Sequence, residues 1–212
     1  MPTRRIAVPR LAPHLSRRLA AKTPDARRSK TTLDKDHQAA LEALAAERVD
    51  RIGPKVSAAI VVADHRTGAI RASVGAARFL DARRAGHVDM TVALRSPGST
   101  LKPFIYGLGI EAGLIARQTL MADTPTTFAD YEPENFDDDF RGMVTVEEAL
   151  RQSLNVPAVT LLEALGPVRL TTRLESAGAT IALPEGYVPT LAVGRGGLGT
   201  RLTDLAGLYA GL

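Results

Sequence analysis

Apolar positions recur with helical spacing in six stretches of the chain, and several of these stretches carry their own start or stop signals. The first follows Asp34, whose carboxylate can accept hydrogen bonds from the free N–H groups of a helix start, and ends before Gly53-Pro54. Another begins at T-V-E-E, residues 145–148, which form a capping box. The pattern predicts helices over residues 35–49, 99–112, 145–153, 157–165, 168–177 and 203–211.

Two short runs near residue 60 follow a strand pattern instead. Residues 56–63 (VSAAIVVA) form a β-branched apolar run, and residues 69–74 (AIRASV) alternate between apolar and polar side chains. The turn sequence D-H-R-T-G lies between them, so we expect an antiparallel hairpin. Because the first run is apolar on both faces, its strand is expected inside a sheet that is covered on both sides.

The composition narrows the classes of protein and of chemistry that are available. Hydrophobic residues make up 45% of the 212 residues and charged residues 24%, which is typical of a soluble globular chain with a real core. Cysteine is absent, which excludes disulfide bonds, a cysteine nucleophile and thiolate metal sites. No run of about 18 apolar residues predicts a membrane span, and no signal-peptide pattern is visible.

Positive charge is concentrated at the start of the chain, although the net charge is only +4. Residues 1–30 hold nine of the 27 Lys and Arg residues and one of the 23 acidic residues. Such a tail can bind nucleic acid or anionic lipid. No aromatic residue occurs before Phe79, so the stacking partners used in single-strand binding are missing. We therefore expect a solvated, flexible leader over residues 1–30 and no nucleic acid as a partner.

The segment R-S-P-G-S-T-L-K-P, residues 95–103, carries the most specific chemistry. Ser99 and Lys102 are three residues apart at a predicted helix start, so both side chains share one face. A serine hydroxyl becomes a good nucleophile when an adjacent base takes its proton. A lysine amine, whose pKa is about 10.4 in water, can be that base once its surroundings favour the neutral form. Pro103 fits less well, because it biases the preceding residue away from helical dihedral angles.

A second element, Ser153-Leu154-Asn155, lies at the end of the helix that follows the capping box. Ser153 can bring a second hydroxyl to Lys102, and Asn155 can offer an amide to a peptide substrate. A Ser-x-x-Lys sequence alone also fits an ordinary capped helix, and Ser153 and Asn155 alone fit a helix C-terminal turn. The two elements together favour a nucleophilic serine site.

The order of these motifs resembles the transpeptidase domain of class A penicillin-binding proteins. The resemblance rests on RSPGSTLKPF, ADTPTTFADYEPENFD, RGMVTVEEALRQSLNVPAV and GRGGLGTRLTDLAGLYA, and it covers roughly residues 30–212. It implies an α+β fold, an α/β/α sandwich like that of the serine β-lactamases and penicillin-binding transpeptidases. It also implies that Ser99 is the acylated nucleophile, Lys102 its base, Ser153 a proton relay and Asn155 a substrate-binding residue, with no cofactor and no metal.

The resemblance further implies a reaction, partners and a cellular location. The reaction would be acyl transfer from a D-alanyl-D-alanine stem peptide to an amine on a neighbouring peptidoglycan strand. The same serine would be acylated by β-lactam antibiotics, and other proteins of cell-envelope synthesis would be further partners. The protein would act in the cell envelope, on the periplasmic side of the inner membrane.

One motif of the family is not found, which keeps a second interpretation open. No Lys-Thr-Gly or Lys-Ser-Gly follows Asn155, so we expect the C-terminal sheet strands of the domain to be missing and the catalytic activity to be weak. The expected organisation is a leader over residues 1–30, a linker strand and helix over residues 31–55, and the front part of the transpeptidase domain over residues 56–212. The alternative function is a catalytically silent binding or assembly module of the cell envelope.

Other patterns carry less weight. Gly194-x-Gly196-x-x-Gly199 after a strand-like stretch over residues 190–193 matches the dinucleotide-binding pattern, but no acidic residue follows at the required distance. The acidic residues at 130–139 lack the spacing of a calcium loop, and no histidine falls in a zinc pattern. Tyr131 and Phe136 flank this acidic loop and can either line a substrate groove or pin the loop to the body, which is the preferred interpretation.

Overall fold

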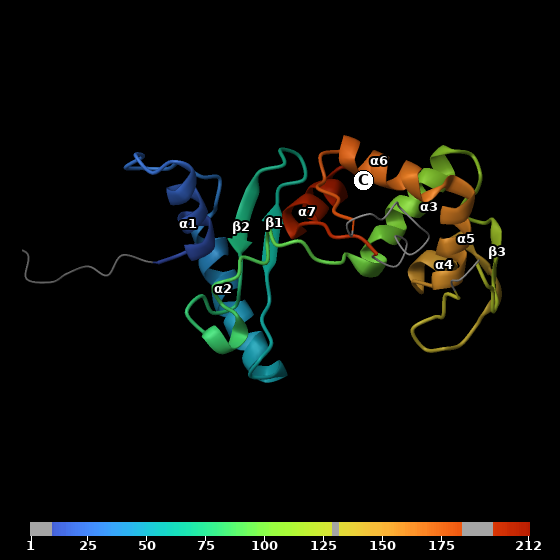
Figure 1. Cartoon of the computed structure of the whole chain (residues 1–212), viewed down its shortest axis with the longest axis horizontal. Coiled ribbons are helices and arrows are strands. Elements are labelled where there is room, and N and C mark those ends of the chain that lie inside the picture. The colour runs from blue at the N-terminus through green and yellow to red at the C-terminus, as the bar shows by residue number, and fades with distance from the viewer. Residues whose placement is uncertain (1–9, 129–131, 184–196) are drawn as a thin grey trace, which may run out of the picture. The chain divides into compact units, whose positions relative to one another are not determined.

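The computed structural model of the chain describes residues 10–128, 132–183 and 197–212, and it divides into two compact units (Figure 1). The first unit comprises the residues up to 94 together with residues 201–212, and the second comprises residues 95–200. In each unit helices pack on a two-stranded antiparallel sheet, so the predicted α+β class is confirmed. No helix among the described residues is both long and apolar enough to cross a membrane.

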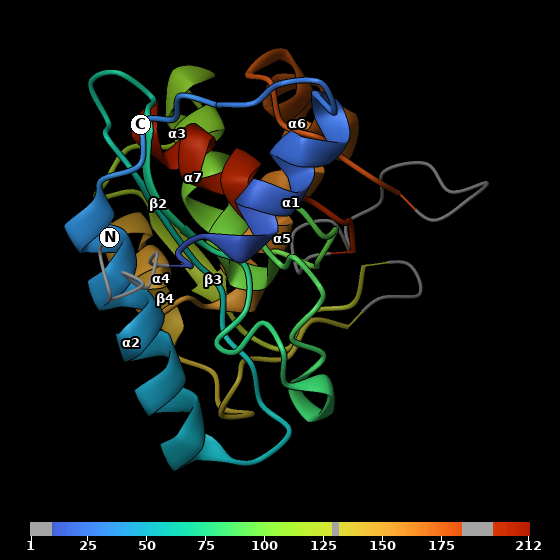
Figure 2. The same cartoon turned by 90° about the vertical axis from the view of Figure 1, so that its left-hand side faces the viewer.

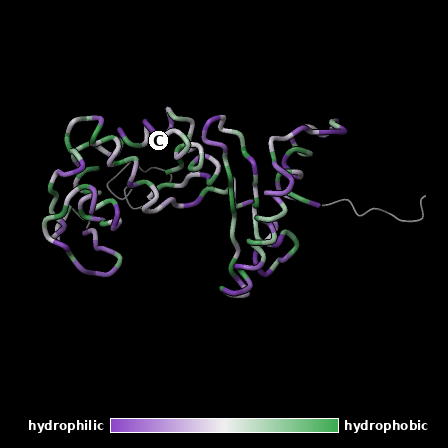
Figure 3. Tube along the Cα trace, turned by 180° about the vertical axis from the view of Figure 1, so that it is seen from behind, coloured by the Kyte–Doolittle hydropathy of each residue, from purple (hydrophilic) through white to green (hydrophobic). Residues whose placement is uncertain are grey.

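The predicted hairpin forms the centre of the first unit. Strand β1 (Ile60–Ala63) pairs antiparallel with β2 (Ile70–Val74). Helix α2 (Lys35–Ile52) packs on β2, and α7 (Leu202–Ala210) packs on β1 from the other side (Figure 1). The apolar residues of β1 and the hydrophilic turn that follows it are visible in Figure 3. Covering on both sides is what the doubly apolar run 56–63 predicts.

The start of α2 is tied to the outer edge of β2. The Asp34 carboxylate accepts hydrogen bonds from the N–H groups of Asp36 and His37, as the sequence predicts, while the Asp34 N–H donates to the Arg71 carbonyl at 2.8 Å. One turn later the buried Gln38 side chain exchanges two hydrogen bonds with the backbone of Ser73, at 2.8 and 3.0 Å. These groups satisfy backbone positions of β2 that no other strand pairs in the described part of the chain.

The leader predicted over residues 1–30 is not flexible throughout its described part. Residues Pro13–Lys22 form helix α1. Its contacts lie far away in sequence: the Ala12 N–H donates to Glu42 at 2.7 Å, and Arg18 pairs with Asp89 at 3.1 Å. The expectation of a flexible segment is therefore wrong from residue 13 to residue 22. A proline at the helix start and contacts with distant residues stabilise this helix. Because those contacts are tertiary, the local sequence pattern does not indicate it.

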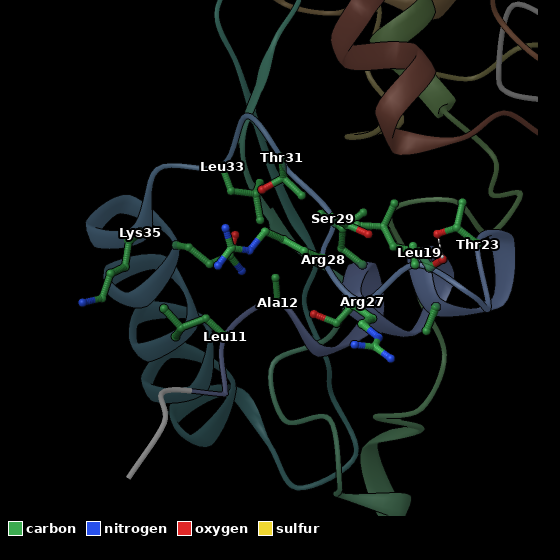
Figure 4. A pocket seen from close by; sticks show the side chains of 15 residues that line it. Leu11, Ala12, Leu19, Thr23, Arg27, Arg28, Ser29, Thr31, Leu33 and Lys35 are labelled. Carbon is green, nitrogen blue, oxygen red and sulfur yellow. Dashed lines mark hydrogen bonds between the residues drawn. The ribbon is translucent and has the colours of Figure 1, made fainter. Parts of the chain in front are cut away.

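Helices α1 and α2 lie on the same side of the hairpin (Figures 1 and 2). A groove of about 520 Å³ is lined by α1, by the segment that follows it and by the start of α2 (Figure 4). Leucine side chains and the two arginines Arg27 and Arg28 contribute to its lining.

Elsewhere in this unit a short 3-10 helix, η1 (Ala82–Arg84), contains the buried residue Arg84. The Arg84 guanidinium donates to the carbonyls of Gly53 and Val56 at 2.6 Å each.

The second unit is built around two helices that pack against each other. The 3-10 helix η2 (Gly98–Leu101) runs directly into α3 (Lys102–Glu111), and α3 packs on α5 (Asn155–Leu165). The surrounding elements are α4 (Val146–Arg151) and α6 (Pro167–Ser176). The six predicted helices are confirmed within a few residues at each end.

A second hairpin in this unit is one that the sequence does not predict. Strand β3 (Leu120–Asp123) pairs antiparallel with β4 (Gly142–Thr145) at the two ends of the stretch that reads as an acidic loop. Leu120 and Met143 are exposed although they are apolar, so burial does not follow an apolar pattern along these strands. The strands are four residues long and their paired residues lie 19 to 25 positions apart, so only the folded chain reveals the pairing.

Candidate active site

The predicted Ser-x-x-Lys motif lies at a helix start, as expected. Ser99 is an exposed residue of η2, and the preceding Gly98 has a φ of +56°, a left-handed conformation that suits glycine. Lys102 is the first residue of α3, with helical φ and ψ of −56° and −41°. Pro103 is compatible with this conformation because it lies in the first turn, where its missing N–H breaks no helical hydrogen bond.

The Lys102 side chain is buried although it is polar, with a relative exposure of 1%. Its amine Nζ donates to the Ser153 carbonyl and to Asn155 Oδ1, the latter at 2.6 Å, and lies 3.2 Å from Ser153 Oγ. Helix α3 therefore brings Lys102 to both polar residues of the second motif. Among the described residues no hydrogen bond joins Ser99 Oγ to the Lys102 amine.

Ser153 adopts a backbone conformation that is unusual for a residue with a side chain. Its φ is +56°, in the left-handed region that costs an L-residue free energy. The residue forms the turn between α4 and α5, and its N–H donates to the Leu150 carbonyl at 3.1 Å. This turn directs both the carbonyl and the hydroxyl of Ser153 to the Lys102 amine.

Asn155 is held at both ends of its carboxamide. Its Oδ1 accepts from Lys102, and its Nδ2 donates to the Glu134 carbonyl of the acidic loop. Ser99, Ser153 and Asn155 line one cavity of about 690 Å³. The structure thus gathers the four predicted residues around a single cavity, with Lys102 buried behind it.

The acidic loop forms another wall of this cavity. Phe136 lines the cavity with a fully exposed ring. The preferred interpretation, that this ring pins the loop, is therefore wrong for Phe136, and its neighbour Asn135 makes anchoring polar contacts with Asp123 and Asn155 instead. Arg141 pairs with Asp137 and with Asp139, and the hydrogen bond from the guanidinium lowers the pKa of Asp137. Tyr131 lies outside the described residues.

Two buried polar residues beside the cavity are not indicated by the sequence patterns. Asp123 on β3 is fully buried, and Asn135 has a relative exposure of 5%. The Asn135 amide donates to both Asp123 carboxylate oxygens, at 3.0 and 2.9 Å. Burial raises the pKa of the Tyr106 phenol, and the negative charge of Asp123 adds to this effect. An asparagine embedded in an acidic run was the only signal that sequence reasoning could have used.

The other candidate features of the sequence lie apart from this site or outside the described residues. The groove of Figure 4 is lined by none of the four predicted site residues. No group of three or more His, Asp or Glu side chains is placed to hold a metal ion among the described residues. The stretch 190–193 and the first two glycines of the G-x-G-x-x-G pattern lie outside the described residues.

Comparisons with known proteins point in one direction. The family described as the penicillin binding protein transpeptidase domain matches residues 58–182, more than half of the chain. Penicillin-binding protein 1C of Escherichia coli (strain K12) is 44% identical over 202 residues, which are 95% of this chain and 26% of that protein. Penicillin-binding protein 1F of Bacillus subtilis (strain 168) is 33% identical over 152 residues, which are 70% of this chain and 20% of that protein.

Solved structures give the same picture of the fold. The structure of PonA1 from Mycobacterium tuberculosis in complex with penicillin V matches with a TM-score of 0.71 and 25% identity. The match covers 92% of this chain and 55% of that chain. Penicillin-binding protein 1A from Haemophilus influenzae, with a TM-score of 0.64 over 74% of this chain and 23% of that chain, shows the fold. The chain spans about a quarter or less of the length of the two curated relatives described above.

Proposed function

The chain belongs to the family of penicillin-binding protein transpeptidase domains, and from this premise we propose that it carries a serine acyl-transferase site that acts on peptidoglycan stem peptides. The observation that carries the proposal is the buried Lys102 amine, which bonds to Ser153 and Asn155 one turn after the exposed Ser99. The proposed location is the cell envelope, where that substrate is found.

In the proposed first half-reaction Ser99 is the nucleophile. Its Oγ attacks the carbonyl carbon between the two terminal D-alanines, or the β-lactam carbonyl, while Lys102 takes the hydroxyl proton. The carbon–nitrogen bond then breaks, and the leaving amine receives a proton through Ser153. With a stem peptide the products are an acyl-enzyme ester on Ser99 and free D-alanine, whereas with a β-lactam the ring opens and its amine stays attached to the acyl group on Ser99. An amine from a neighbouring strand, or water, attacks the ester in the second half-reaction.

The bonding of the Lys102 amine supports its role as the base. The Ser153 carbonyl and Asn155 Oδ1 can only accept hydrogen bonds, and together they use two N–H groups of the amine. A neutral amine has two N–H groups and a lone pair, so these two contacts are compatible with the neutral form that a base requires. Burial away from water in itself disfavours the charged ammonium form.

The contacts of Ser153 and Asn155 fit their proposed roles as well. Ser153 Oγ is 3.2 Å from the Lys102 amine and also lines the cavity, so a proton can pass from the amine to a leaving group there. Asn155 is fixed at both ends of its carboxamide and faces the same space. The exposed ring of Phe136, which also lines the cavity, offers an apolar surface to a stem peptide.

A fluorescent penicillin combined with intact mass spectrometry tests the proposal directly. We expect the chain to gain the mass of one penicillin, on Ser99, and the Ser99→Ala variant to gain none. Equal labelling of that variant and the wild type would refute the assignment of the nucleophile. Stem-peptide binding without any acylation of the wild-type chain would favour the silent binding module instead.

A further inference from the structure

Helix α5 starts without a side-chain cap of its own. Its N-cap residue is Leu154, whose side chain makes no capping hydrogen bond. The first N–H groups of any helix lack a partner within the helix. Here the N–H of Asn155, the first residue of α5, donates to Asn135 Oδ1 at 2.8 Å, so a residue from the acidic loop caps this helix.

The orientation of the Asn135 carboxamide is set by Asp123. The amide Nδ2 donates to the two carboxylate oxygens of Asp123 and to the Asp139 carbonyl at 2.9 Å. The Asp123 carboxylate also accepts from the Arg141 N–H at 2.9 Å. Because an ionised carboxylate only accepts hydrogen bonds, the NH₂ end of Asn135 must face it. The oxygen end is thereby presented to the N–H of Asn155.

A continuous chain of hydrogen bonds therefore runs from β3 to the base. It passes from Asp123 to Asn135, from Asn135 to Asn155, and from Asn155 Oδ1 to the Lys102 amine. Asp123 is fully buried and Asn135 nearly so, which shields the hydrogen bonds between these two residues from competition by water. The series of hydrogen bonds ends beside the cavity that Ser99 lines.

Resting on the proposed function, we propose that Asn135 and Asp123 are positioning residues of the acylation reaction. They act through Asn155: Asn135 fixes where α5 begins, and Asp123 fixes which way Asn135 faces. Loss of either interaction lets Asn155 shift relative to the Lys102 amine. A displacement of about 1 Å in a catalytic group can cost about 10²-fold in rate.

A reciprocal exchange of the two side chains gives the sharpest test. Asn135→Asp places two carboxylates against each other in a buried site, where they repel. Asp123→Asn places two amides together, so one NH₂ group faces another donor. In the double variant, the new amide at position 123 donates to the new carboxylate at position 135 and accepts from the Arg141 N–H. That carboxylate still accepts from the N–H of Asn155. The Asp139 carbonyl loses its donor and faces a carboxylate oxygen instead, so we expect the recovery to be partial.

The experiment measures penicillin acylation of the whole chain by stopped-flow fluorescence, well below the melting temperature of each variant. The dissociation constant of the initial complex and the acylation rate constant are obtained separately. Thr145→Ala serves as the matched control, because it removes a helix cap from the neighbouring α4 without touching the chain of hydrogen bonds. Hydrogen exchange at the Asn155 N–H provides a readout that does not depend on activity.

We expect Asn135→Ala and each single exchange to lower the acylation rate constant about 10²-fold, with little change in the dissociation constant. The double exchange is expected to recover at least tenfold of that loss, and Thr145→Ala to acylate like the wild type. Acylation by Asn135→Ala at the control rate would overturn the inference, as would a double exchange no better than the singles.

If the proposed function is wrong, the wild-type chain is not acylated on Ser99. Hydrogen exchange at the Asn155 N–H is then the only measurement that tests whether Asn135 and Asp123 position Asn155. Loss of protection at the Asn155 N–H in Asn135→Ala, with recovery in the double exchange, would support the role. Unchanged protection in Asn135→Ala would overturn it.

Discussion

Lys102 shows at the level of a single residue how burial and chemistry are connected in this site. Its amine lies inside the second unit, and the Ser153 carbonyl and Asn155 Oδ1 accept its hydrogen bonds. A surface lysine three residues after a serine would be a solvated charge. Burial next to oxygen acceptors turns the same spacing into a candidate base.

Replacing Lys102 by methionine removes the amine, while the unbranched side chain keeps a similar volume and is one heavy atom shorter. We expect the second-order rate of penicillin acylation to fall by about 10²–10⁴-fold, the range in which a general base contributes. The loss should appear at every pH between 6 and 9. Recovery of the rate at high pH in the variant would show that solvent base replaces Lys102 and that its role is smaller than proposed.

Ser153 combines a hydroxyl with a left-handed backbone, and two substitutions separate these properties. Ser153→Ala and Ser153→Gly both remove the hydroxyl, so both should slow acylation to a similar extent. Glycine adopts a φ of +56° without strain, so Ser153→Gly should be more stable than Ser153→Ala by about 1 kcal/mol. Urea denaturation measures this difference. Acylation at the wild-type rate by Ser153→Ala would contradict the relay.

At the level of elements, the packing of α3 on α5 brings the two motifs together. The helices approach closely at Gly109, where a Cβ atom would lie 2.9 Å from Leu161 Cδ2 and 3.0 Å from two atoms of Ile115. Lys102 begins α3 and Asn155 begins α5. The distance between the base and its amide partner therefore depends on how closely these helices pack.

Gly109→Ala should push α3 and α5 apart. We expect a loss of about 1–3 kcal/mol in the free energy of unfolding, as for other overpacked cores, together with slower acylation. Gly107→Ala is the matched control on the same helix, because Gly107 is exposed and nothing lies within 4 Å of an added Cβ. That change should stabilise the chain by about 0.5–1 kcal/mol. Equal effects of both variants in urea denaturation would contradict the packing argument.

The capping box of α4 can be tested in the same way. The Thr145 hydroxyl accepts from the Glu148 N–H at 3.2 Å, and the Glu148 carboxylate accepts from the Thr145 N–H at 2.9 Å. Thr145→Ala should lower the free energy of unfolding by about 1 kcal/mol, and Thr145→Ser should restore most of it. Differential scanning calorimetry checks the order of the three melting temperatures, and a Thr145→Ala protein as stable as the wild type would contradict it.

At the scale of the whole molecule, acidic caps and ion pairs connect stability to pH. Hydrogen bonds from backbone N–H groups lower the pKa of Asp34 and Glu148, while the Arg83 and Arg141 side chains lower the pKa of Asp81 and Asp137, respectively. A carboxylate whose pKa is lower in the folded chain stabilises that chain at a pH above its unfolded value. This contribution is lost as the pH falls through the folded value.

The melting temperature should therefore fall when the pH is lowered below about 4.5, the usual pKa of a glutamate, and should continue to fall below 3.8. The Asp34→Asn variant should lose less on acidification, because its cap no longer titrates. Calorimetry from pH 7 to pH 3 measures the difference. An identical pH dependence in both proteins would show that Asp34 does not contribute.

Much of the local structure could be predicted from the sequence because it depends on neighbouring residues. Asp34 and the T-V-E-E box set helix starts, the run 56–63 and the turn after it set the hairpin, and Ser99 and Lys102 share a helix start. Each of these features needs only hydrogen bonds or steric contacts between residues that are close in sequence, at most 14 positions apart in the hairpin, so the chain encodes them directly.

Only the tertiary structure decided the features that join distant residues. Helix α1 depends on contacts with Glu42 and Asp89, and the β3–β4 hairpin pairs strands across the acidic loop. The cap of α5 by Asn135 and the exposure of Phe136 likewise follow from how the chain closes on itself. The sequence by itself determined which four residues are proposed to carry the chemistry, while long-range packing determined which residues meet, because a buried polar group must find its partner wherever the fold supplies one.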